Sequence, residues 1–75
     1  ELIWAGDYDS DGYEEYVLSN SSGGAIVQLR DGAWYVAEIR RAAPIAAATA
    51  LQRQGKPQLI LVYHDGVIEA MQIKR

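Results

Sequence analysis

The chain has 75 residues, is 49% hydrophobic, carries a formal net charge of −3 and contains no cysteine. This length allows one small domain at most, and such a chain buries only about 60% of the surface that its unfolded form exposes. Disulfide bonds cannot add stability here, which leaves a bound metal ion or a partner chain. The acidic balance argues against a nucleic-acid-binding protein, and no apolar run approaches the roughly 18 residues of a membrane span.

The first predicted element is a strand over Leu2–Ala5, and a strongly acidic segment follows it. Residues 1–15 hold six of the ten acidic side chains and no basic residue, whereas the rest of the chain carries four acidic and seven basic residues. Because clustered carboxylates repel one another, this segment is either a disordered acidic loop or is neutralised by a cation.

The spacing of the acidic residues favours the cation. Residues 7–15 read Asp-Tyr-Asp-Ser-Asp-Gly-Tyr-Glu-Glu, with acids at loop positions 1, 3, 5 and 9 and Gly12 at position 6. Calcium takes six to eight oxygen ligands, and a glycine at the sixth position permits the sharp turn that such a loop needs. An EF-hand would also need a glutamate at position 12, where Leu18 stands, so the EF-hand and dockerin interpretations fail. The alternative to a calcium site is a solvated acidic turn.

This segment, together with the apolar Tyr16-Val17-Leu18 after it, resembles the calcium loop of FG-GAP/VCBS repeats, the blades of integrin-α-type β-propellers. The resemblance implies a loop between the first and second strands of a four-stranded antiparallel blade. It implies side-chain oxygen ligands from four acidic residues and a carbonyl ligand from a fifth residue, namely Asp7, Asp9, Asp11, Glu15 and Tyr13. Glu15 stands where the family usually has Asp, and Ser10 where it often has Gly, which predicts an altered or weaker site.

Further strands are predicted along the chain by alternating apolar residues and turn signals. Tyr16–Asn20, Ala25–Arg30 and Ala33–Arg40 are expected to be strands, with a turn at residues 21–24 and a hairpin turn at Asp31-Gly32. These strands complete the first predicted unit, a blade-like repeat over residues 1–43.

Residues 44–75 are predicted to form a second, degenerate and incomplete blade-like repeat. Its strands are expected at Ile45–Leu51, Leu59–His64 and Val67–Lys74, with a turn at Asp65-Gly66. Helix propensity alone would make the alanine-rich Ile45–Leu51 helical, but the repeat aligns it with the first strand.

The alignment behind this prediction places Gly12 on Gly55. It sets Tyr16-Val17-Leu18 against Leu59-Ile60-Leu61 and replaces the acidic positions by Ala50, Gln52, Gln54 and Gln58. The second loop is therefore expected to keep the turn and to bind no metal. A period near 43 fits a propeller blade, and the alternative is a chance similarity between short β-segments.

The predicted fold class is all-β, with antiparallel four-stranded propeller-type blades, about one complete and one incomplete. Two blades cannot close a ring of four to eight, so the chain is expected to be part of a longer propeller, to assemble with copies of itself, or to fold as something smaller. Trp4 and Trp34 are expected to be core or blade-packing residues.

The predicted function is a calcium-stabilised β-propeller repeat module with a structural or ligand-binding role, in which the metal is structural. The alternatives are a self-assembling propeller subunit and a fragment of a propeller-bearing hydrolase, lyase or carbohydrate-binding protein. No catalytic residues are predicted, because the chain has a single histidine, His64, and no Gly-x-Ser-x-Gly elbow. The expected partners are other blades, copies of the chain, or a protein or carbohydrate ligand, and the expected location is extracellular or periplasmic, where calcium is abundant.

Overall fold

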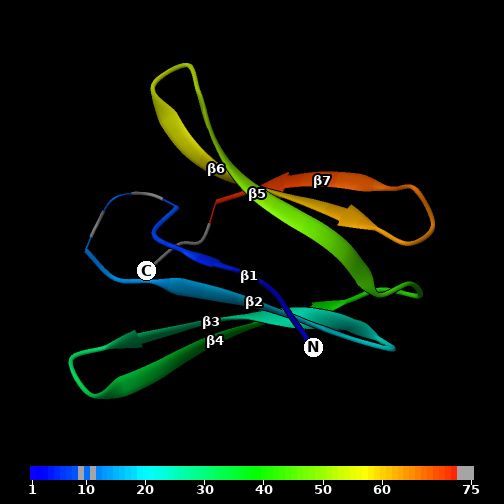
Figure 1. Cartoon of the computed structure of the whole chain (residues 1–75), viewed down its shortest axis with the longest axis horizontal. Coiled ribbons are helices and arrows are strands. Elements are labelled where there is room, and N and C mark those ends of the chain that lie inside the picture. The colour runs from blue at the N-terminus through cyan, green and yellow to red at the C-terminus, as the bar shows by residue number, and fades with distance from the viewer. Residues whose placement is uncertain (9, 11, 73–75) are drawn as a thin grey trace.

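The computed structural model describes residues 1–8, 10 and 12–72, which form two antiparallel β-sheets (Figure 1). The first sheet has the order β1-β2-β3-β4 and the second the order β5-β6-β7. The strands are β1 (Leu2–Gly6), β2 (Glu15–Asn20), β3 (Gly23–Arg30), β4 (Ala33–Arg40), β5 (Ile45–Arg53), β6 (Lys56–Tyr63) and β7 (Ile68–Met71). No helix occurs in the described ranges, so the prediction of an all-β antiparallel fold is confirmed.

The strands follow the predicted ones closely, and the alanine-rich segment is the strand β5 rather than a helix. Its helix propensity is overridden because β5 pairs with β6 from Ile45↔Tyr63 to Arg53↔Lys56 and packs its Ile45 side chain into the core. β7 ends at Met71, earlier than expected, and Lys74 lies outside the described residues.

The hydrophobic core lies between the two sheets. The first sheet contributes Val17, Ile26 and Ile39, and the second contributes Ile45, Leu59, Leu61 and Tyr63. β5 makes the contact between the sheets by packing against β1 and β2. Trp4 packs at the edge of this core, as predicted, but Trp34 is 62% exposed and lies outside it.

The hairpins β1–β2 and β5–β6 share two irregular features. Each first strand has a register shift near its beginning, between Leu2 and Trp4 in β1 and between Ile45 and Ala47 in β5. In each, a backbone hydrogen bond also lies just beyond the shift. It joins Ser19 N–H to the Glu1 carbonyl at 2.8 Å and His64 N–H to the Pro44 carbonyl at 3.0 Å.

These features define which residues of the two hairpins correspond. The residues on either side of the shift correspond, so Leu2 matches Ile45 and Trp4 matches Ala47. Their cross-strand partners correspond as well, so Val17, the partner of Trp4, matches Val62, the partner of Ala47. The predicted alignment placed Val17 on Ile60 instead. The first strands therefore align as predicted, whereas the second strands align two residues later, because ten residues (50–59) separate the cross-strand partners Thr49 and Ile60 and only eight (7–14) separate the corresponding Gly6 and Glu15.

The predicted metal-free loop around Gly55 is mostly strand. The ladder continues through Ala50↔Leu59 and Leu51↔Gln58 to Arg53↔Lys56 and is closed by Gln54 and Gly55, with φ of 55° and 75°. Two successive residues with positive φ are typical of the type I′ turn, whose twist matches paired strands. The turn at Gly55 was predicted correctly, but the loop around it was not, because the residues that replace the acidic positions, Ala50, Gln52 and Gln58, are uncharged and pair across the hairpin.

Candidate metal loop

The loop that joins β1 to β2 leaves and re-enters the first sheet at one cross-strand pair. Gly6 ends β1, Glu15 begins β2, and the two residues are partners in the ladder. Asp7 and Glu15 therefore flank the loop at the same end of the sheet. The Asp7 Oδ2 accepts a hydrogen bond of 2.8 Å from the Gly12 N–H, which folds the loop back on its own beginning. Two described loop residues have positive φ, Ser10 at 58° and Gly12 at 92°.

Glu15 lies beneath this loop with 0% of its surface exposed. Its Oε1 accepts a hydrogen bond of 3.3 Å from the Tyr8 N–H, and its Oε2 accepts one from the Gln28 side-chain amide. A buried carboxylate is costly unless hydrogen bonds compensate the loss of water. Both oxygens are engaged here, so Glu15 ties the loop backbone at Tyr8 to Gln28 on β3.

Tyr13 holds the returning arm of the loop against the β3–β4 hairpin. The Arg30 guanidinium lies over the Tyr13 ring, 4.7 Å from its centre, which is a cation–π distance. The Tyr13 hydroxyl donates a hydrogen bond of 3.3 Å to Asp31 Oδ1 at the Asp31-Gly32 turn. The loop is therefore attached at both arms, through Tyr8 and through Tyr13.

The predicted ligands have different environments. Asp7 is exposed, Tyr13 is half-buried, Glu15 is buried, and Asp9 and Asp11 lie outside the described residues. Within the described ranges, no three Asp, Glu, His or Cys side chains form a group that could hold a metal ion.

The chemistry of the described part still fits a hard cation. Asp7 offers a carboxylate at the surface, and the Tyr13 carbonyl belongs to the same loop. Hard cations such as calcium take ligands of this kind, carboxylate and carbonyl oxygens. Glu15, the remaining predicted ligand among the described residues, anchors the loop through its contacts with Tyr8 and Gln28.

Sequence reasoning did not identify Gln28 and Tyr8 as the partners of Glu15. The available signal was the polar residue Gln28, two positions after Ile26 and therefore on the same, buried face of β3. A polar side chain on a core-facing position needs a buried partner. Naming that partner required the β2–β3 register, in which Glu15 pairs with Gln28.

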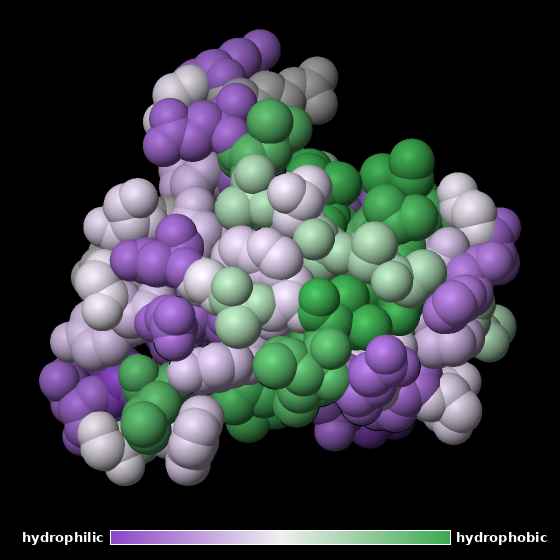
Figure 2. Space-filling model, viewed as in Figure 1, coloured by the Kyte–Doolittle hydropathy of each residue, from purple (hydrophilic) through white to green (hydrophobic). Residues whose placement is uncertain are grey.

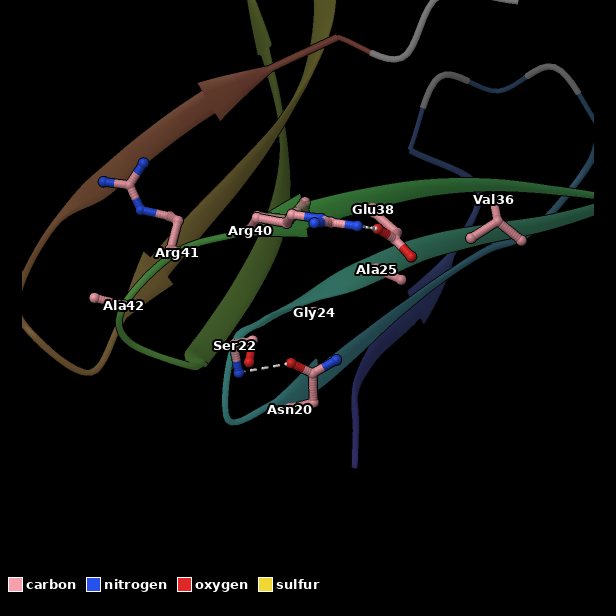
Figure 3. Close-up of a pocket in the computed structure, with 10 residues that line it drawn as sticks. Asn20, Ser22, Gly24, Ala25, Val36, Glu38, Arg40, Arg41 and Ala42 are labelled. Carbon is pink, nitrogen blue, oxygen red and sulfur yellow. Dashed lines mark hydrogen bonds and ion pairs between the residues drawn. The ribbon is translucent and has the colours of Figure 1, made fainter.

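A shallow groove lined by both polar and apolar residues lies at the other end of the first sheet (Figure 3). Arg40 contacts Glu38 through Nε and Nη2 at 3.1 and 3.0 Å, and the Ser22 N–H donates to Asn20 Oδ1 at 2.8 Å. Arg41 points away from these residues, and its guanidinium lies 4.5 Å from the centre of the Tyr63 ring. The Arg40 charge is compensated by Glu38, so the groove is a weaker candidate for a binding site than the acidic loop.

Tyr63 connects β6 to β7 inside the core. Its hydroxyl donates a hydrogen bond of 2.8 Å to Glu69 Oε1, and Arg41 lies 3.5 Å from Glu69 Oε2. Burial, followed by this hydrogen bond, raises the pKa of Tyr63 to about 12. The adjacent His64 is exposed and lies directly after the end of β6.

Comparisons with known protein families, with curated proteins and with solved structures found no match to this chain. The resemblance to FG-GAP/VCBS repeats therefore depends on the residues of the loop and on the two related hairpins. No helix in the described ranges is long and apolar enough to cross a membrane.

Proposed function

We propose that the chain is a calcium-stabilised β-repeat module of the propeller type, with a structural or ligand-binding role and no catalytic one. The observation that carries this proposal is the acidic loop at residues 7–14, closed by the Asp7–Gly12 hydrogen bond above the buried Glu15. In this proposal β1–β4 form a complete blade and β5–β7 an incomplete one.

The two hairpins support a role for the acidic residues beyond strand pairing. β5 and β6 have the same register shift as β1 and β2, and a turn of two residues is enough to join them. The acidic loop is thus not needed to build such a hairpin, and its crowded carboxylates would oppose folding unless a cation neutralised them.

A cation in this loop would stabilise the fold by coupling binding to loop closure. Asp7, Asp9 and Asp11 would supply carboxylate oxygens and Tyr13 its carbonyl. Glu15 would hold the loop in place through Tyr8 and Gln28. The ligand-binding role would belong to the connections at the ends of the sheets, which would present side chains to a protein or a carbohydrate outside the cell or in the periplasm.

Thermal melting followed by circular dichroism tests the calcium proposal. Extracellular calcium modules bind with dissociation constants of about 0.1–1 mM. With a dissociation constant of about 0.1 mM, 1 mM calcium would add about 1.4 kcal/mol, which is roughly 6–10 °C in Tm for a domain of this size. We expect this rise over EDTA, and a much smaller one with 1 mM magnesium.

Two matched variants make the test specific. Asp9→Asn should remove most of the calcium-dependent rise, whereas Glu14→Gln, which removes a charge from the same loop at a position outside the predicted ligand set, should keep it. A wild-type chain that melts at the same temperature in calcium and in EDTA contradicts the proposal. Equal losses in the two variants would indicate general charge repulsion in place of a calcium site.

A further inference from the structure

The face of the first sheet that points away from the core is apolar over most of its cross-strand rows and charged towards one end of β4, where Glu38 and Arg40 lie. Cross-strand partners form rows on it: Tyr16, Val27 and Val36 in one, Leu29 and Trp34 in the next, and Leu2, Leu18, Ala25 and Glu38 in a third. Several of these side chains are strongly exposed, with Trp34 at 62% and Val36 at 60%. Figure 2 shows apolar side chains gathered in patches at the molecular surface. Large contiguous apolar patches are uncommon on the surface of soluble monomers.

The outer face of the second sheet is apolar as well. Ala47, Val62 and Ile68 form one cross-strand row, with Ile68 69% exposed. Ile60 and Ala70 belong to the next row of the same face. Each sheet therefore has two largely apolar faces, of which the internal core uses only one.

The shared register shift shows how the four faces are related. The outer face of the first sheet corresponds to the core face of the second, because Leu2 matches Ile45, Leu18 matches Tyr63 and Tyr16 matches Leu61. One position on this face departs from the pattern, since Val27 matches Glu69.

The remaining two faces correspond in the same way. Trp4, Val17 and Ile26 on the core face of the first sheet match residues on the outer face of the second, namely Ala47, Val62 and Ile68. The buried Glu15 departs here, because its match is Ile60. The core therefore joins two faces that do not correspond to each other, the core face of the first sheet and the core face of the second. The two outer faces are the equivalents of these core faces, with the sheets exchanged, so they form a second pair of the same kind.

We infer that a second copy of this chain docks head to tail on the first, with the outer face of its first sheet on the outer face of the second sheet. This contact would repeat the internal packing of the sheets. It joins two different surfaces, so it is heterologous and would continue from copy to copy until a ring closes. The inference rests on the repeat part of the proposed function and does not depend on calcium.

A second copy is the occupant that these faces favour, because each exposed face already has a working partner of the same kind inside the molecule. Leu18 would occupy the place that Tyr63 has in the internal contact, and Ile68 the place of Ile26. An unrelated partner would have no reason to match both faces.

Light scattering coupled to size-exclusion chromatography tests the inference with two variants at about 100 µM chain. Leu18→Lys places a charge on the first outer face, and Ile68→Lys places one on the second. We expect the wild type to elute as a multimer and each variant as a monomer. An equimolar mixture of the two variants should give dimers, because one intact pair of faces remains. His64→Lys, at an exposed position outside both faces, should leave the multimer unchanged.

Several results would overturn the inference. They are a monomeric wild type, a mixture of variants that stays monomeric, and one variant that assembles like the wild type, which would indicate a symmetric contact through one face. Circular dichroism shows whether each variant is folded, and Leu18→Thr and Ile68→Thr replace a lysine variant that is not. Repeating the wild-type run in EDTA separates this inference from the calcium proposal, because a folded multimer should persist without calcium.

Discussion

The hairpins β1–β2 and β5–β6 have the same register shift and the same flanking backbone hydrogen bond, yet they are closed in different ways. β5 and β6 pair up to Arg53↔Lys56 and are joined by two residues, whereas β1 and β2 stop pairing at Gly6↔Glu15. Beyond that pair, residues 7–14 form an acidic loop that folds over a buried carboxylate.

The difference teaches that strand pairing and loop function are separable in this fold. Gln54 and Gly55 meet the requirements of a turn through backbone conformation alone. The acidic loop instead depends on side chains, namely the Asp7 contact with Gly12 and the Glu15 contacts with Tyr8 and Gln28. Substitutions at corresponding positions should therefore have different effects in the two hairpins.

The largest difference is expected between Glu15 and its match Ile60. Glu15→Ala leaves the Tyr8 N–H and the Gln28 amide without their buried acceptor and should lower the free energy of unfolding by about 3 kcal/mol. Ile60→Ala removes a partly buried side chain and should cost about 1 kcal/mol, less than a fully buried one. Urea unfolding in EDTA, followed by circular dichroism, measures both.

Glu15→Gln is the control for this comparison, because the glutamine can still accept one of the two hydrogen bonds. Glu15→Gln should lower the free energy of unfolding by less than Glu15→Ala and by more than Ile60→Ala. If Glu15→Ala cost less than Ile60→Ala, the buried carboxylate would not be the anchor of the loop.

Much of the strand arrangement could be predicted from the sequence, because the signals are local. β4 has the predicted bounds Ala33–Arg40, since Asp31-Gly32 sets the turn before it. β5 could be predicted as a strand only through its alignment with β1, against its own helix propensity.

The site was less predictable, because it depends on pairing between distant residues. The Glu15–Gln28 contact requires the β2–β3 register, and the turn expected at residues 21–24 is shorter in the structure, with β3 beginning at Gly23. A slip of one residue would have placed Gln28 on the other face. The ladder beyond Ala50 was also missed, since matching Gly12 with Gly55 hides the different lengths of the connections.

The next largest effect on stability is expected at Tyr63, the residue of the second hairpin that corresponds to Leu18 of the first. Tyr63→Phe removes the hydrogen bond to Glu69 and should cost about 1.5 kcal/mol near pH 8. The ordinary pKa of 10.0 applies when the chain is unfolded and about 12 when it is folded, so the folded state holds the proton more tightly. The stability that Tyr63 contributes is therefore complete below pH 10 and is lost as the pH rises towards 12.

Urea unfolding of the wild type and of Tyr63→Phe between pH 8 and pH 12 measures this loss. The difference between the two should shrink across the upper part of that range, because other titrating groups, Tyr16 among them, are common to both chains. A difference that stays constant up to pH 12 would mean that Tyr63 is not held in its protonated form by the fold.

The smallest expected difference in stability is between alanine variants of Gly12 and Gly55, the two glycines that were matched when the repeats were aligned. A Cβ at Gly12 or at Gly55 would meet no atom within 4 Å, so alanine at either position tests the backbone alone. Gly55→Ala should cost about 1 kcal/mol, because a two-residue turn requires positive φ at this position. Gly12→Ala should cost roughly half as much in EDTA, because the longer loop can spread the strain over several residues. Urea unfolding of both variants in one buffer decides the comparison: an equal cost would mean that the acidic loop, even without calcium, is held as tightly as the turn, and its conformation would then come from Asp7 and Glu15 rather than from a bound cation.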